Sequence, residues 1–308
     1  MVVRRGPREA PFGRGRTAAR VLARVIDVAA WLGARVPPSI THRLAVVGGT
    51  IEWAVRPHLR ERLSTNLAHV AGVPVGSREA SRLARAELVN EARRSADLLW
   101  AIGNPDEFAA TVRVDGAARV VDAARRGNGV VLVGLHFGGW EVAASVPAKV
   151  VPVRTHVIVA DDWLAWAIEH VRRAAGLETI PRSRAALAAL RALRAGEAVL
   201  VMGDDAFPGP EGEAPRTHTV ELCGARARLP AGSVTLARLA GAPIVPFHVL
   251  PEGPRHWRVV IEPELAPPRR ATEEPDVLQQ LADRWTALLR CHPTHWAARF
   301  AIAWELPE

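Results

Sequence analysis

The segment that most clearly carries acid–base chemistry consists of His136, the pair Gly138-Gly139 and Glu141. A run of β-branched and aliphatic residues, 129–135, comes directly before it and predicts a buried strand. In α/β sheets, catalytic and ligand-binding groups collect just beyond the carboxyl ends of strands, and His136 lies at that position. The pattern therefore predicts an active-site histidine.

Glu141 is the carboxylate that could orient the imidazole. Five residues of continuous helix turn through about 500°, which would place Glu141 off the face of His136. The Gly138-Gly139 turn removes this restriction, so the carboxylate could fold back onto the ring. A carboxylate on one ring nitrogen raises the basicity of the other, which can then take a proton from a hydroxyl. The alternative is that both residues are structural.

From about residue 112 onward, short β-branched runs alternate with amphipathic helical patterns. The expected strands are residues 129–135, 156–160, 198–202, 244–250 and 257–262, and the expected helices are 116–126, 163–175, 183–194, 231–239 and 276–290. Ser183 and Gly196 are expected to cap the helix at 183–194. This alternation predicts an α/β fold, a layered domain with a largely parallel central sheet flanked by helices.

An N-terminal helical region is expected before this core. The patterns predict helices at residues 17–34, 40–55, 59–70 and 77–100 and a short turn at 106–110, with proline and glycine at the breaks. The arginine-rich first 16 residues are expected to be disordered. We therefore expect a basic tail at 1–16, a helical region at 17–110 and a catalytic core at 111–308.

The chain has 308 residues and a formal net charge of +8. Its positive charge is almost entirely arginine, which favours anionic partners such as lipid headgroups, donor phosphates or nucleic acid. A GC-rich genome that encodes arginine in place of lysine is the alternative explanation. No nucleic-acid-binding motif is present, so we expect no nucleic-acid partner. Two cysteines are too few for a disulfide framework or a zinc site, and indicate a reducing compartment.

The first expected helix, 17–34, mixes aliphatic residues and Trp31 with arginines. That composition is typical of an interfacial helix at a membrane surface. The alternative is a helix packed on the protein's own core. No apolar run reaches the roughly 18 to 20 residues that a spanning helix needs, and no cleavable signal peptide is predicted.

Residues 135–141, Leu-His-Phe-Gly-Gly-Trp-Glu, resemble the His-x4-acidic motif of the bacterial lipid A late acyltransferases and of the actinobacterial phosphatidylinositol mannoside acyltransferase. These proteins belong to the glycerophosphate acyltransferase superfamily. Other segments stand in the family's order: residues 180–184 with the helix after them, 199–205, 228–232, 241–246, His292-Pro293 and His295-Trp296. The resemblance covers about residues 60–300 and is more specific for the family than for the substrate.

The resemblance implies an O-acyltransferase at the cytoplasmic face of the plasma membrane. It would move a fatty acyl group from acyl coenzyme A or acyl carrier protein to a hydroxyl of a glycolipid or phospholipid, without a covalent intermediate, metal or cofactor. His136 would be the general base and Glu141 its orienting residue. Backbone amides near Gly138 and Gly139 could stabilise the oxyanion. An apolar groove for the acyl tail is expected.

Asp204 resembles the family's acidic residue after the following strand, although a one-residue shift would select Asp205 instead. It could contact the acceptor or His136, or it could cap a helix or turn. Three arginines could bind donor phosphates or an acceptor headgroup, or could be solvated surface residues. They are Arg182, Arg184 and Arg228.

The sequence departs from the family at Ala160-Asp161-Asp162, where members often carry an arginine. The departure leaves open a specialised-metabolite hydroxyl or amine as acceptor, and the acidic, proline-rich loop at 208–215 could cover a different substrate. A hydrolase that activates water with His136, and a silent lipid-binding protein of the same fold, are the rival interpretations. A metallohydrolase would have His218 as its nearest additional ligand.

Overall fold

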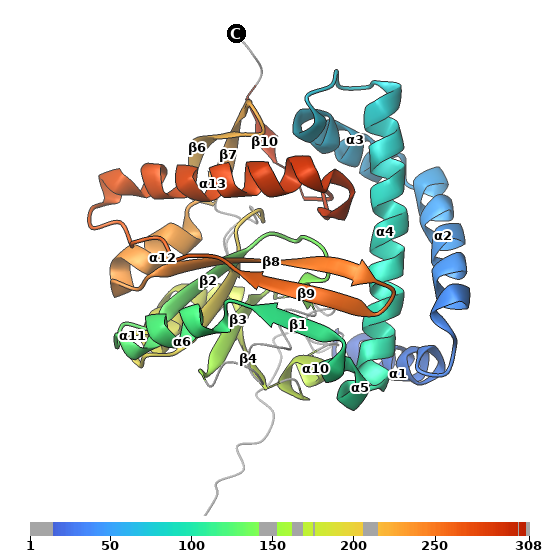
Figure 1. Ribbon diagram of the computed structural model, residues 1–308, viewed down its shortest axis with the longest axis horizontal. Helices are drawn as coiled ribbons and strands as arrows, with labels where there is room; N and C mark the ends of the chain where they lie inside the picture. The colour runs from blue at the N-terminus through green and yellow to red at the C-terminus, as the bar shows by residue number, and fades with distance from the viewer. Residues whose placement is uncertain are drawn as a thin grey trace, which may run out of the picture.

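The structure is a computed structural model that describes residues 15–141, 153–161, 169–174, 176–205, 215–300 and 302–305. Its centre is a seven-stranded sheet with the order β1-β9-β8-β2-β5-β3-β4 (Figure 1). The strands are β1 Val112–Asp115, β2 Val130–Gly134, β3 Thr155–Val159, β4 Leu177–Pro181, β5 Ala198–Met202, β8 Ile244–Gly253 and β9 His256–Ile261. All neighbours pair in parallel except β8 and β9. The predicted α/β fold with a largely parallel sheet is confirmed.

Alternate side chains of the central strands enter two separate cores. Val131 and Val133 of β2 belong to one core, and Val130 and Leu132 belong to the other. Residues of a strand point alternately to its two faces, so a strand that is apolar throughout must be covered on both sides. All five residues of β2 are buried for this reason.

Helices cover both faces of the sheet. Residues of α6 (Ala117–Arg125) contribute to the second core, and residues of α11 (Ala185–Arg194), α12 (Gly232–Ala240) and α13 (Glu274–Cys291) contribute to the first. Three short 3-10 helices adjoin these helices. η1 (Arg182–Arg184) precedes α11, η2 (Ala271–Glu273) precedes α13, and η3 (Pro293–His295) follows α13. The expected helices 116–126, 231–239 and 276–290 are confirmed within a few residues. Of the helix expected at 163–175, α10 (Glu169–Ala174) lies within the described residues.

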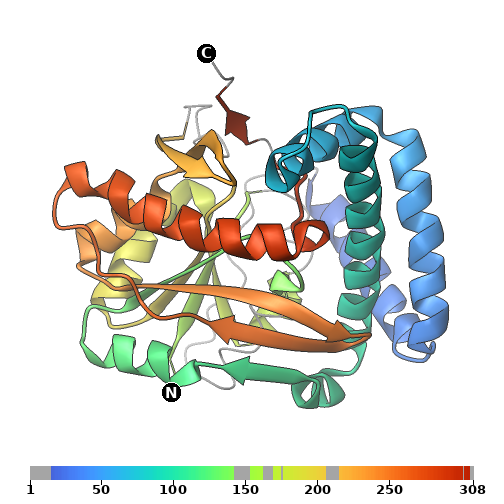
Figure 2. The ribbon, with the colours of Figure 1, turned by 45° about the horizontal axis from the view of Figure 1, so that its top comes forward.

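A second sheet, absent from the sequence prediction, has the order β10-β7-β6. Its strands are β6 Thr217–Leu222, β7 Ala225–Pro230 and β10 Ala303–Trp304. β6 and β7 form a hairpin around Cys223 and Gly224, which both have positive φ. Helix α13 lies between the two sheets (Figures 1 and 2). β1 and β4 were also not predicted, because their short runs interleave charged or proline residues.

The N-terminal helices lie together at one end of the main sheet (Figure 1). They are α1 Gly15–Gly33, α2 Pro38–Val55, α3 Pro57–Ala71, α4 Arg78–Gly103 and α5 Pro105–Ala110, as the sequence predicted within a few residues. Gly49 allows α2 and α4 to approach closely, because a Cβ there would lie 2.8 Å from the Leu88 oxygen. Within the described chain, no helix is long and apolar enough to cross a bilayer. The expected tail, 1–16, lies almost wholly outside the described residues.

One capping prediction is wrong. Ser183 lies in η1 and does not cap α11, whose first turn has no side-chain cap. Its hydroxyl instead donates to Asp161 Oδ1 at 2.9 Å, and its amide donates to Asp161 Oδ2 at 2.7 Å. Asp161, part of the departure from the family pattern, thus ties the end of β3 to η1. Gly196 follows the helix with a φ of +79°, as a glycine after a helix end commonly does.

Candidate active site

His136 and Asp204 meet because their strands are parallel neighbours in register. Gly134, the last residue of β2, pairs with Met202, the last residue of β5. His136 and Asp204 each lie two residues beyond those ends, and the Gly203 amide donates to the Gly134 oxygen at 2.8 Å. The carboxyl ends of adjacent parallel strands therefore bring the two side chains together.

The Asp204 carboxylate is buried, with 1% of its surface exposed, and accepts hydrogen bonds from three groups. His136 Nδ1 lies 2.9 Å from Oδ1, and the His136 amide lies 3.2 and 3.1 Å from the two oxygens. The indole Nε1 of Trp296 donates to Oδ2 at 2.8 Å. This arrangement places the proton of the neutral ring on Nδ1 and leaves Nε2 as the basic nitrogen.

The expectation that Glu141 binds the His136 ring is wrong. The carboxylate that hydrogen-bonds to the ring is that of Asp204. Contact with His136 was one of the two roles predicted for this residue. Glu141 is helical in conformation and comes directly after the glycine turn, and its charge acts on His136 without a hydrogen bond to the ring. Burial and the nearby Glu91 charge raise the pKa of Glu141 to about 7.

Burial lowers the pKa of the His136 imidazole, but nearby negative charge outweighs that effect. The hydrogen bond and charge of Asp204, with the charges of Asp205 and Glu141, hold the pKa above its ordinary value. Burial also raises the pKa of Asp205, to about 7. The site therefore favours the imidazolium that forms when His136 accepts a proton.

The glycine turn after His136 has a specific backbone requirement. Gly138 has a φ of +59°, and a Cβ there would lie 1.8 Å from the Val249 oxygen, so only glycine fits. Its amide donates to the His295 oxygen at 2.7 Å. Because that amide is already bonded, it is not a free oxyanion donor. Gly139 is also buried, and its role as an oxyanion donor stays a prediction.

Two aromatic rings enclose the His136 imidazole. The Phe300 ring lies 4.1 Å from it between centroids, tilted by 32°, and the Trp140 ring meets it edge-on at 4.8 Å. Phe300 was not predicted from the sequence. Trp296 was noted only as part of the family-like carboxyl end. The rings cover part of the imidazole, while Asp204 binds its Nδ1.

A carboxyl-terminal segment, residues 296–300, brings Trp296 and Phe300 to the site. The Ala297 amide donates to the His136 oxygen at 2.7 Å. From α3, the buried Asn66 side chain donates to the oxygens of Ala298 at 2.7 Å and Phe300 at 2.9 Å. Trp304 in turn donates to Asn66 Oδ1 at 2.8 Å. Asn66 thus holds this segment against the site.

A buried ionic cluster on α4 lies beside Glu141 and was not predicted. Arg94 Nη2 is 3.2 Å from Glu87 Oε1 and also contacts Glu91, which lies 3.5 Å from Arg299. Burial raises the pKa of Glu87 to about 8. The i, i+4 and i+7 spacing of Glu87, Glu91 and Arg94 was visible in the sequence, but the ion pairs that they form were not.

The three predicted arginines have different positions. Arg182 Nη2 is 3.5 Å from the Asp205 oxygen, so it borders the site. Arg184 is exposed at the start of α11. Arg228 is exposed on β7, where its Nε donates to Thr217 at 3.1 Å. Among the described residues, neither Arg184 nor Arg228 contacts His136 or Asp204.

His218 does not join the site, because its Nε2 contacts Glu274 at 3.2 Å. In the described part of the chain, no three His, Cys, Asp or Glu side chains gather as metal ligands would.

Two grooves flank the contact between α2 and α4. The groove of about 540 Å³ is lined by Leu44, Ala45, Gly48, Ala96 and Leu99 together with Glu91 and Arg299 of the ionic cluster. It is mainly apolar and adjoins residues that lie near Glu141. The groove of about 560 Å³ lies on the other flank. The expected apolar groove at His136 itself stays a prediction.

Comparison of the sequence with known proteins identifies a family. The sequence model for bacterial lipid A biosynthesis acyltransferases matches residues 16–298. The chain belongs to this family. The acyltransferase is 28% identical over 277 residues to the phosphatidylinositol mannoside acyltransferase of Mycobacterium tuberculosis (strain ATCC 25618 / H37Rv), covering 87% of this chain and 84% of that one. It is 27% identical over 279 residues to the protein of the same name from Mycolicibacterium smegmatis, covering 87% of each. The resemblance inferred from residues 135–141 is therefore confirmed.

Proposed function

We propose that this acyltransferase moves a fatty acyl group from acyl coenzyme A or acyl carrier protein to a hydroxyl of a membrane glycolipid, with His136 as the general base. The observation that carries the proposal is the His136 Nδ1–Asp204 contact of 2.9 Å, which leaves Nε2 free to act. The relatives' names suggest a mannosylated phosphoinositide as acceptor.

In the proposed reaction, Nε2 of His136 takes the proton of the acceptor hydroxyl as its oxygen attacks the thioester carbonyl. Collapse of the tetrahedral intermediate breaks the C–S bond, and the imidazolium returns the proton to the leaving thiolate. Asp204 stabilises the imidazolium between these steps. No group is bound covalently to the protein, and the thioester donor is the only co-substrate.

The apolar faces of α1 and α2 support a position at the membrane surface. Both helices expose large apolar side chains at i, i+4, i+7 and i+11 and at one further position, with exposed fractions from 48% to 67%. These are Val21, Val25, Val28, Trp31 and Leu32 on α1, and Ile40, Leu44, Val47, Ile51 and Val55 on α2. Exposed apolar patches of this kind mark interaction sites. A peripheral location at the cytoplasmic face of the plasma membrane is part of the proposal.

Both interpretations of the first predicted helix, an interfacial helix and a helix packed on the protein's own core, apply to α1. Its Ala30 is buried, and Gly103 of α4 is in close contact with the Ala30 oxygen. One side therefore packs on the protein, and the opposite side carries the exposed apolar residues that an interfacial helix needs.

The test uses purified protein, labelled acyl coenzyme A and a lipid extract that contains mannosylated phosphoinositides. Wild type should label a lipid product. His136→Ala should lower the rate by about 10² to 10⁴-fold, since this is the usual contribution of general base catalysis. His256→Ala is the control, because this exposed histidine contacts only a loop oxygen, that of Pro254, and should keep full activity.

Equal activity in His136→Ala would refute the proposed base. Absence of any labelled product with wild type would favour a silent lipid-binding protein. Release of free fatty acid without a lipid product would instead favour the hydrolase interpretation. If only a soluble extract supplied the acceptor, the glycolipid assignment would be wrong and a specialised metabolite would replace it.

A further inference from the structure

The second groove, of about 560 Å³, carries a concentration of positive charge that the proposed reaction does not use. Four arginines of α4 line it, Arg78, Arg82, Arg85 and Arg93, and we call it the arginine groove. Trp53 of α2 and Asn90 of α4 also line it. No acidic side chain is among the described residues that line it. The volume suits a small ligand or headgroup.

The charges in the arginine groove are poorly compensated. Arg78, Arg82 and Arg85 follow one another at i, i+4 and i+7, and like charges at this spacing destabilise a helix. Arg82 pairs with Glu79 at 3.5 Å, but both side chains are exposed, so the pair contributes little. Among the described residues, Arg78 and Arg85 have no acidic partner.

Arg93 supplies an independent observation at the inner end of the groove. Its Nε is buried and has no hydrogen-bond acceptor among the described residues, and its Nη1 lies 3.4 Å from Asn90 Oδ1. An unsatisfied buried donor costs free energy that an anionic acceptor would recover. The arginine groove therefore offers an anion four guanidinium groups, one of which has an unpaired buried donor.

The neighbouring surface indicates where that anion comes from. Val47, Ile51 and Val55, the exposed apolar residues of α2, are on the same helix as Trp53, which lines the groove. A membrane lipid presents its phosphate directly above its acyl chains, so one lipid could meet both surfaces. We propose that the arginine groove binds the phosphate headgroup of an anionic membrane phospholipid. The inference rests on the proposed membrane location but not on the chemistry of His136.

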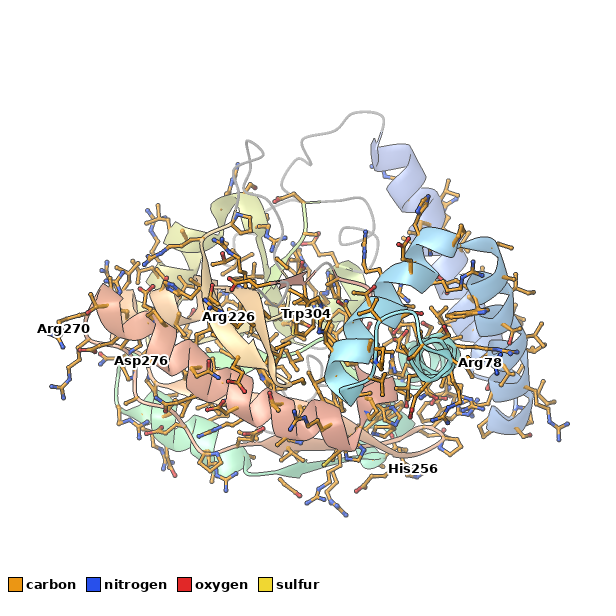
Figure 3. The ribbon with its side chains drawn as sticks, turned by 90° about the horizontal axis from the view of Figure 1, so that it is seen from above. Arg78, Arg226, His256, Arg270, Asp276 and Trp304 are labelled. Atoms are coloured by element: carbon orange, nitrogen blue, oxygen red, sulfur yellow. The ribbon has the colours of Figure 1, made fainter. Side chains whose placement is uncertain are left out.

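The arginine groove is distinct from the mainly apolar groove that adjoins residues near Glu141. It lies on the opposite flank of the α2–α4 contact from the groove that includes Glu91 and Arg299. In Figure 3, Arg78 lies beside the N-terminal helices, at the opposite end of the molecule from Arg270 and Asp276 of the α13 region. The bound lipid would anchor the enzyme at the membrane surface, beside the exposed apolar residues of α2.

The test compares two triple variants of the full chain with the same change in net charge. One is Arg78→Gln with Arg82→Gln and Arg85→Gln. The control is Arg191→Gln with Arg194→Gln and Arg269→Gln, three exposed arginines outside the groove. α11, which carries Arg191 and Arg194, lies at the opposite side of the molecule from α2 (Figure 1). Sedimentation with vesicles of phosphatidylglycerol and phosphatidylcholine in equal amounts measures binding.

The groove variant should bind these vesicles about 100-fold more weakly than wild type, since each arginine near an anionic surface is worth about fivefold. The control variant should lose only a few-fold. His136→Ala should bind like wild type, which separates this result from a failure of the proposed reaction.

Equal losses in the two triple variants would overturn the proposal, because net charge alone would then explain binding. A second arm titrates wild type and the groove variant with inorganic phosphate in a calorimeter. If phosphate binding depended on the groove but vesicle binding did not, a free phosphate compound would be the ligand and the lipid assignment would be wrong.

Discussion

At the residue scale, the basicity of His136 depends on Asp204. This carboxylate accepts from the His136 ring and backbone and from Trp296, so it cannot turn away without breaking several hydrogen bonds. Glu141, in contrast, affects the ring only by its charge. The two acidic residues should therefore differ in what their loss does: Asp204 fixes geometry and charge together, and Glu141 changes charge alone.

Asp204→Asn should shift the pH dependence of the reaction. A general base acts when unprotonated, so the rate rises with pH through the raised pKa of His136. The substitution would remove the charge that raises this pKa, so the acidic limb should move to lower pH. The maximal rate should fall by about 10² to 10⁴-fold, since the ring loses its orientation. Rates measured from pH 5 to 9 in about half-unit steps would show both effects.

Asp205→Asn is the matched control for this prediction. Asp205 contributes only its charge to His136 and makes no hydrogen bond with the ring. It should move the acidic limb less and leave the maximal rate close to that of wild type. An Asp204→Asn enzyme with an unmoved acidic limb would show that His136 is not the group that titrates.

At the element scale, three elements distant in sequence build the site. β2 and β5 deliver His136 and Asp204 by their register, and the segment after η3 delivers Trp296 and Phe300. α3 contributes through Asn66, which holds that segment by two carbonyl oxygens. Asn66 is therefore a positioning residue that acts through Phe300 and Trp296.

Asn66→Ala should lower kcat about tenfold while KM stays nearly constant, because the ring environment of His136 changes but the substrate contacts do not. The unfolding free energy should fall by about 1 to 3 kcal/mol, the cost of leaving buried polar groups unsatisfied. Steady-state kinetics and urea unfolding measure the two effects. Asn104→Ala, which removes one local bond to the Trp100 oxygen, is the control. A variant of Asn66 that lost stability but kept wild-type kcat would contradict the positioning role.

At the scale of the whole molecule, the apolar residues of α1 and α2 form two exposed stripes at the end of the sheet where the N-terminal helices lie (Figure 1). The α2–α4 contact separates the arginine groove from the groove that contains Glu91 and Arg299. The molecule thus has one surface suited to lipid, in which apolar side chains lie between a cationic groove and a mainly apolar one.

Leu44→Ser with Ile51→Ser should weaken partition onto neutral phosphatidylcholine vesicles by about tenfold or more, since burial of each large apolar side chain is worth about 1.5 to 3 kcal/mol when complete. Leu187→Ser with Leu239→Ser is the matched control, because these leucines are similarly exposed on α11 and α12. Activity in detergent should not change in either variant. Equal losses of vesicle binding in both would mean that α2 has no special role at the membrane.

Much of the fold follows from patterns that are local in the sequence. The alternation of β-branched runs with amphipathic helices predicts the α/β core, and β5 was expected at the residues it occupies. The position of His136 after a buried strand is equally local. The need for glycine at position 138 also depends on the Val249 oxygen of the distant strand β8. Short strands such as β1, β6 and β7 were missed because charged and polar residues interrupt their apolar residues.

The identity of the carboxylate on His136 depends on the tertiary structure. Glu141 is close in sequence, but the helix that begins there does not return it to the ring. Asp204 reaches the ring because β2 and β5 pair in parallel and in register. Trp296, Phe300 and Asn66 likewise act through contacts between distant segments. Residue types and short spacings determine which groups can react, and long-range strand pairing and packing decide which of them meet.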